Sequence, residues 1–154
     1  MKKFLTIVML GCLPVIAPAQ VPVMATVFKQ MPDSLMPYLS KNNRLDMLDF
    51  MDAKMKAEVT NLLDGRSEMT AITDDSLSIR LSDALRVDMK LERVEQPVDS
   101  GYYVVRLVRT YIINANQTER IADVYSSVWR KLSSCLEDSS LLRRDEEVFE
   151  EPHF

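Results

Sequence analysis

The chain has 154 residues and a formal net charge of −4, from 19 basic and 23 acidic side chains. Its length fits a single domain, and its 47% hydrophobic and 27% charged residues are typical of a globular protein rather than a disordered one. Three glycines and a single histidine, His153, exclude a glycine-rich phosphate loop, a histidine metal cluster and a histidine-dependent catalytic triad. An acidic chain with 7% aromatic residues is also a poor match for nucleic acid.

The N-terminus has the three parts of a secretory signal peptide. A basic start of two lysines is followed by an apolar run over residues 4–16 and by the small-residue cleavage site Ala17-Pro18-Ala19. We therefore predict that residues 1–19 are a signal peptide, removed before Gln20, and that the protein is exported to the periplasm or beyond the cell. No later apolar run is long enough to cross a membrane, so we expect no transmembrane segment in the mature chain.

The two cysteines raise separate questions. Cys12 ends the sequence Met-Leu-Gly-Cys, which is similar to the end of a bacterial lipoprotein signal, so lipid anchoring at Cys12 is the alternative to cleavage before Gln20. Cys135 would be the single cysteine of the mature chain and cannot form an internal disulfide. It is interpreted as a half-buried thiol, with a partner in an intermolecular disulfide or a reactive thiol as the alternatives.

The first part of the mature chain is expected to contain one main helix. Residues 20–32 are interpreted as an extended lead-in whose "VMATVF" could add a short strand, followed by a short helical turn capped by Asp33. The main amphipathic helix is predicted over residues 43–63, beginning with capping-box character at Asn43 and ending at a C-cap formed by Asp64 and Gly65. Its apolar face is a stripe of Leu45, Leu48, Met51, Met55, Val59, Leu62 and Leu63.

After Gly65 the hydrophobic period changes from 3.6 to 2, which indicates strands. Residues 76–82 and 84–95 alternate apolar and polar side chains and are predicted to form an antiparallel hairpin. A central strand follows over "YYVVRLVRTYII", another over "ERIADVYSSVW", and then a short helix or turn containing Trp129, Leu132 and Leu136.

The predicted fold class is α+β, with one long N-terminal amphipathic helix packed on an antiparallel meander sheet of four or more strands. Residues 20–136 would form this single domain, and residues 137–154 a charged C-terminal tail. The acidic run of the tail is interpreted as a solvated segment, with an acidic binding arm as the alternative.

Part of the chain resembles a known family. Met31 to Leu35 read Met-Pro-Asp-Ser-Leu, residues 43–46 read Asn-Arg-Leu-Asp, and residues 73–75 read Thr-Asp-Asp, with Tyr125 and Trp129 near the end. This pattern is similar to an uncharacterised family of small secreted proteins of unknown function from Bacteroidales. The resemblance implies an exported protein and brings no activity, ligand or catalytic residue with it.

Three residues of the predicted helix are candidate interaction or pocket residues. Met47 belongs to a methionine stripe with Met51 and Met55, interpreted as core or partner groove, with Cu(I) binding as the alternative. Phe50 lies opposite the apolar face and is interpreted as a lone exposed aromatic or as covered by the N-terminal segment, with a second buried face or a homodimer contact as the alternative. Asp52 falls inside the apolar stripe. It is expected to pair with an arginine of the sheet, such as Arg80, Arg106 or Arg109, to lie at the edge of the stripe, or to serve as a pocket acid.

Other carboxylates do not converge in the sequence. Asp46 and Asp49 fan out along the predicted helix with Asp52, whereas a calcium site needs oxygen ligands that point to one place, so we expect no metal and no cofactor. The preferred hypothesis is an exported non-enzymatic module that binds an unknown protein or glycan in the envelope or outside the cell. The alternative is a small hydrolase or small-molecule-binding protein with a carboxylate-lined pocket between helix and sheet.

Overall fold

The computed structural model describes residues 22–99, 101–115 and 117–137. The predicted signal peptide, Cys12 and the C-terminal residues 138–154 lie outside the described residues, so the predictions made for them remain predictions.

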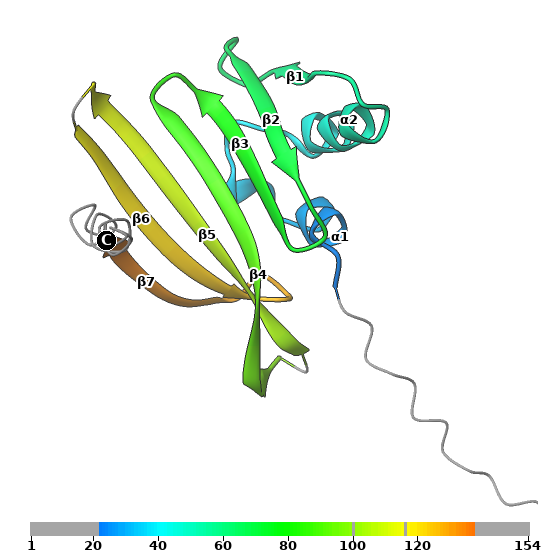
Figure 1. Cartoon of the computed structure of the whole chain (residues 1–154), viewed down its shortest axis with the longest axis vertical. Helices are drawn as coiled ribbons and strands as arrows, with labels where there is room; N and C mark the ends of the chain where they lie inside the picture. The colour runs from blue at the N-terminus through cyan, green and yellow to red at the C-terminus, as the bar shows by residue number, and fades with distance from the viewer. Residues whose placement is uncertain (1–21, 100, 116, 138–154) are drawn as a thin grey trace, which may run out of the picture.

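The fold is dominated by one antiparallel sheet of seven strands, and each strand pairs with the next one in the sequence. Figure 1 shows this meander as a twisted sheet with the helices gathered at its β1–β3 end. The predicted antiparallel meander is therefore confirmed. The strands are β1 (Ala57–Thr60), β2 (Arg66–Ile72), β3 (Ser76–Ser82), β4 (Leu85–Val98), β5 (Gly101–Asn114), β6 (Gln117–Ser126) and β7 (Lys131–Glu137).

The strand alternation seen in the sequence sets the register. Leu77 of β3 lies opposite Met89 of β4, and Ile79 lies opposite Val87, so the apolar residues of both strands share one face. A shift by one residue would turn every one of these side chains toward the other face, which explains why this register is preferred. The predicted hairpin between these strands is present. The segment expected to be a short helix or turn after Trp129 instead forms a turn and then β7.

The prediction of one long N-terminal helix over residues 43–63 is wrong. The structure has short helices, α1 (Met24–Lys29), the 3-10 turn η1 (Asp33–Leu35) and α2 (Lys41–Asp52), and β1 follows α2. Lys54 adopts a left-handed φ of 56°, which ends the helical path just after α2. Leu62 and Leu63, which extended the apolar stripe in the sequence, are 61% and 67% exposed.

The segment "VMATVF", considered as a strand, is also helical. Met24, Val27 and Phe28 have the spacing of one helix face, and all three are buried. The N–H of Met24 donates a hydrogen bond to the carbonyl of Asp74 at 2.7 Å, which ties the start of α1 to the turn between β2 and β3.

The core lies between the helices and one face of the sheet, here called the helix-side face. It is rich in methionine, an unbranched side chain that fills the irregular space between short helices and a twisted sheet. Six of the ten methionines are buried in it: Met24, Met31, Met36, Met47, Met69 and Met89.

A buried arginine joins the helical segments to one another. Arg44 of α2 is 1% exposed. Its guanidinium donates hydrogen bonds to the carbonyl oxygens of Met31 and Leu39 at 2.7 and 3.1 Å, and lies 2.8 Å from the carboxylate of Asp33. One side chain therefore holds the segment between α1 and α2 in place.

Within the described ranges, no helix has the length and apolar character needed to cross a membrane.

Candidate functional site

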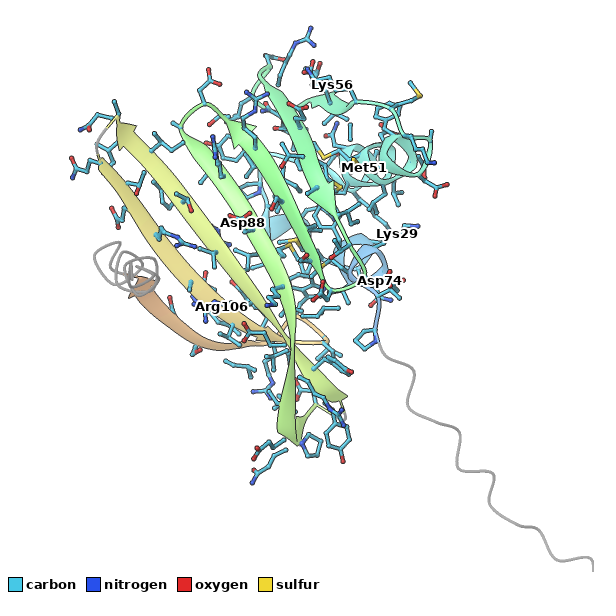
Figure 2. The ribbon with its side chains drawn as sticks, in the orientation of Figure 1. Lys29, Met51, Lys56, Asp74, Asp88 and Arg106 are labelled. Carbon is cyan, nitrogen blue, oxygen red and sulfur yellow. The ribbon has the colours of Figure 1, made fainter. Side chains whose placement is uncertain are left out.

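The face of the sheet that points away from the helices is called the open face. Residues directly opposite each other in antiparallel strands project to the same side, so the register assigns each side chain to a face. The pairs Ser78–Asp88 and Asp88–Val108 belong to the open face because their neighbours Ile79, Val87 and Leu107 are in the core. Figure 2 shows Asp88 and Arg106 over the middle of the sheet, apart from Lys29, Met51 and Asp74 beside the helices.

Basic side chains meet across the strands of the open face. Arg80 of β3 lies directly opposite Arg86 of β4, and Lys90 of β4 lies directly opposite Arg106 of β5. Arg120 of β6 is on the same face, two strands away from β4. Like charges placed directly opposite each other in a sheet repel, so both pairs favour acidic groups close by.

Acidic residues lie beside some of these basic residues. Glu68 of β2 accepts a hydrogen bond from Arg80 at 2.6 Å, and Asp88 accepts one from the hydroxyl of Ser78 at 2.6 Å. Among the described ion pairs, none involves Arg86 or Lys90. A hollow of about 460 Å³ lies on this part of the face and is lined by Glu68, Thr70, Ser78, Ile79, Arg80, Arg86 and Asp88.

The open face also carries an apolar row beside its basic residues. Val104 and Val108 of β5 and Ala122 of β6 project from this face, because their cross-strand partners are Glu92, Asp88 and Val108. They are buried, yet they are not part of the core beneath the helices. These three side chains are therefore not accessible to a ligand, whereas Val124 of β6, directly opposite Arg106 on the same face, is only half-buried.

A second hollow, of about 530 Å³, lies where α1, α2 and the turn between β2 and β3 meet. Three carboxylates and one amine line its rim, from Asp49, Asp52, Asp74 and Lys29, and Leu48, Met51 and Ile72 supply apolar contacts. All four charged side chains are exposed. In the described part of the chain no group of three or more acidic, histidine or cysteine residues could hold a metal ion.

The three candidate residues from the sequence have different surroundings. Met47 is 0% exposed and belongs to the core, while Met55 lies beyond α2 and is 59% exposed, so the stripe with Met51 does not extend along one helix. Phe50 is partly buried and packs against the core. These positions do not test whether Met47 and Phe50 contact a partner, and that part stays a prediction.

Asp52 does not lie within a buried stripe. It is the last residue of α2 and is exposed at the rim of the hollow beside the helices. Two of the arginines considered as its partners are paired elsewhere, Arg80 with Glu68 and Arg109 with Asp123. A role for Asp52 as a pocket acid remains a prediction.

One buried ion cluster lies on the helix-side face and was not singled out in the sequence. Asp123 of β6 is 4% exposed, pairs with Arg109 of β5, and has Lys131 Nζ at 2.8 Å from its Oδ1. Burial raises the pKa of Asp123, but hydrogen bonds from Lys131, Ser134 and Arg109 outweigh it and hold the pKa at about 2. Arg109 also donates to the carbonyl of Leu35 at 3.2 Å, so the cluster anchors η1 to the sheet.

Comparisons with known proteins identify a family and a shared fold. A family model described as "Protein of unknown function (DUF3256)" matches residues 17–146. The chain is similar to a solved "Structure of a domain of an uncharacterized protein from Porphyromonas gingivalis W83", with a TM-score of 0.57 and 18% identity, over 86% of this chain and 59% of that one. This chain thus spans about three fifths of that neighbour, and the likeness concerns the fold alone. No curated protein matches the chain.

Proposed function

The chain belongs to the DUF3256 family of proteins of unknown function, and we propose that it is an exported, non-enzymatic domain that binds an acidic polypeptide segment on the open face of its sheet. The observation that carries this proposal is the pairing of like charges across the strands, Arg80 with Arg86 and Lys90 with Arg106. Such pairs concentrate positive charge on adjacent strands, and a ligand with carboxylates can place negative charge beside both members of a pair.

The mixture of side chains on the open face favours a polypeptide over a sulfated glycan. Val124 gives a half-buried apolar contact directly opposite Arg106, and a glycan whose surface is sulfate and hydroxyl has nothing to place there. A peptide that mixes glutamate or aspartate with apolar residues satisfies both kinds of side chain.

Export is supported by the composition of residues 1–19 and by the resemblance to secreted proteins of Bacteroidales. The structural neighbour comes from Porphyromonas gingivalis, which belongs to the same order. An exported domain that presents a rigid sheet face needs no catalytic group, and we propose that this domain has none.

The binding proposal is tested with charge reversal on the open face. Arg86→Glu combined with Lys90→Glu turns both like-charge pairs into opposite-charge pairs, so the melting temperature is expected to stay the same or to rise. Affinity for a fluorescein-labelled peptide of repeating Glu-Glu-Val, measured by fluorescence anisotropy, is expected to fall about tenfold or more, which corresponds to about 1.4 kcal/mol. Binding to the unaltered protein should weaken as salt is added.

A matched control makes the same charge change elsewhere. Lys41→Glu combined with Lys54→Glu alters two exposed residues of the α2 region and should leave the affinity unchanged. Equal losses in the two double variants would mean that net charge alone governs binding, and the proposal would be wrong. Preferential binding of dextran sulfate or of a single-stranded oligonucleotide would also contradict it.

The hollow beside the helices supports the alternative, a small-molecule-binding protein or small hydrolase. Its rim brings Asp49, Asp52 and Asp74 around an apolar floor. This alternative would be favoured if a screen of small substrates gave turnover that is lost in Asp49→Asn and Asp52→Asn but kept in the Arg86 and Lys90 double variant.

A further inference from the structure

The C-terminal residues 138–154 are rich in acidic side chains, which complement the basic side chains of the open face. They contain six acidic and two basic residues. The acidic residues flank an apolar pair in the sequence Asp145-Glu-Glu-Val-Phe-Glu-Glu151. Carboxylates and apolar side chains therefore occur together in one short segment of the same chain.

The last described strand ends within reach of the open face. Glu137, the last residue of β7, lies opposite Arg120 of β6, and Arg120 belongs to the open face. The distance from β7 across to β4 is about 15 Å at ~4.8 Å per strand, whereas 17 extended residues reach about 50 Å at ~3.3 Å per residue. Residues 145–151 can therefore reach Arg106, Lys90 and Arg86.

From this complementarity and reach we infer that residues 138–154 are the resident ligand of the open face, bound within the same molecule, so that an outside acidic peptide has to displace them. The inference rests on the proposed function, because it names the occupant of the same face. A tethered segment has an effective concentration in the millimolar range, which is enough to keep a weak site filled. The full-length chain therefore limits its own affinity for other acidic peptides.

The first test changes only the charge of the segment. Glu146→Gln, Glu147→Gln, Glu150→Gln and Glu151→Gln in one full-length variant should raise the affinity for the labelled Glu-Glu-Val peptide about tenfold, because the competitor within the chain is weakened. The matched control neutralises four exposed carboxylates elsewhere, through Asp46→Asn, Asp64→Asn, Glu95→Gln and Glu119→Gln. It is expected to change the affinity less than twofold.

The second test locates the segment directly. Phe149 is replaced by p-benzoylphenylalanine, the full-length protein is irradiated, and the crosslinked peptides are identified by mass spectrometry. Crosslinks to residues of β4, β5 and β6 on the open face support the inference. A mixture of isotopically heavy and light protein shows whether each crosslink joins one molecule or two.

The outcomes separate the inference from the proposed function. Crosslinks that map elsewhere, together with an affinity that the four glutamine substitutions do not raise, overturn the inference, while loss of peptide binding in the Arg86 and Lys90 double variant still upholds the proposed function. Crosslinks that join heavy to light protein overturn binding within one molecule. If Arg86→Glu with Lys90→Glu leaves peptide binding intact, the proposed function itself fails.

Discussion

At the scale of single residues, Asp123 is a buried ionised side chain that the sheet stabilises through ion pairs. It is a carboxylate with two cationic partners, Arg109 from the neighbouring strand β5 and Lys131 from the other neighbour, β7. Both partners outweigh the cost of burial and keep the carboxylate ionised far below neutral pH. The cluster therefore joins β5, β6 and β7 to one another, and through Arg109 it also holds η1 on the sheet.

The depressed pKa of Asp123 makes the stability of the fold depend on acid. The folded pKa of about 2 lies below the value of 3.8 for a free aspartate, so the contribution is complete above the unfolded pKa and is lost as pH falls toward the folded one. The difference corresponds to about 2 kcal/mol at ~1.36 kcal/mol per pKa unit. We expect Asp123→Asn to lower the unfolding free energy by about that amount at neutral pH.

Urea denaturation at a series of pH values checks this expectation. The unaltered protein should lose stability between about pH 5 and pH 2, and the Asp123→Asn variant should show a flatter curve over that range. Asp83→Asn is the control, because the side chain of Asp83 is fully exposed. A curve for Asp123→Asn that runs parallel to the unaltered one would show that Asp123 does not contribute to the acid dependence.

Neither Arg44 nor Asp123 could be identified from the sequence, for the same physical reason. A charged residue is interpreted as exposed unless a partner is known, and the partners of Arg44 are backbone carbonyls at positions 31 and 39, which carry no sequence signature. The partners of Asp123 depend on the register between β5, β6 and β7. Long-range pairing of this kind appears only in three dimensions.

At the scale of elements, the start of α2 differs from the sequence prediction by a few residues that matter energetically. Asn43 was expected to begin the helix, but the N-cap is Ser40 and Asn43 is the third residue after it. The Ser40 hydroxyl accepts the backbone N–H of Asn43 at 3.1 Å, and the Asn43 side chain accepts the N–H of Ser40 at 3.1 Å. Asn43 also donates to the carbonyl of Thr60 in β1, which fixes α2 to the sheet.

This capping box predicts that Ser40→Ala lowers the unfolding free energy by about 1 kcal/mol, because one N–H in the first turn of α2 loses its acceptor. Thermal denaturation followed by circular dichroism measures the loss. Ser40→Asp, which keeps an acceptor at the N-cap, should restore most of the stability. The control variant Ser34→Ala changes an exposed residue of η1 and should leave the unfolding free energy unchanged. An equal loss of unfolding free energy in both variants would show that the N-cap hydrogen bond is not its cause.

The predicted helix runs past the observed end of α2 because the 3.6-residue period of a helix and the 2-residue period of a strand cannot be told apart over a short stretch. Val59 lies on the predicted helix face, but it also fits a strand, because β1 has only four residues and alternation cannot be recognised over so few. What decides the outcome is the loop after β1. The buried Asn61 accepts hydrogen bonds from the N–H groups of Leu63 and Gly65 and donates to Ser67, which turns the chain back into β2.

At the scale of the whole molecule, strands with a repeating apolar and polar pattern could be predicted from the sequence. Features that depend on a single long-range contact could not. Strict alternation over residues 76–95 identifies two strands and their wet faces, so Arg80, Arg86 and Lys90 could be assigned to the solvent side from the sequence. Which of them meet across the strands requires the register. The sequence therefore identifies the single basic residues of the candidate site, and the structure shows that they form one surface.

The last prediction concerns the mature protein as a whole. If residues 1–19 are a signal peptide, protein recovered from the periplasm or medium should begin at Gln20, as measured by intact-mass spectrometry. Ala19→Arg places a large charged residue at the cleavage site and should leave the chain unprocessed, whereas Cys12→Ala should change nothing. The lipoprotein alternative requires the reverse pattern, with processing and membrane attachment lost in Cys12→Ala and kept in Ala19→Arg. The two variants together therefore decide whether the binding face works free in the exported compartment or tethered to a membrane.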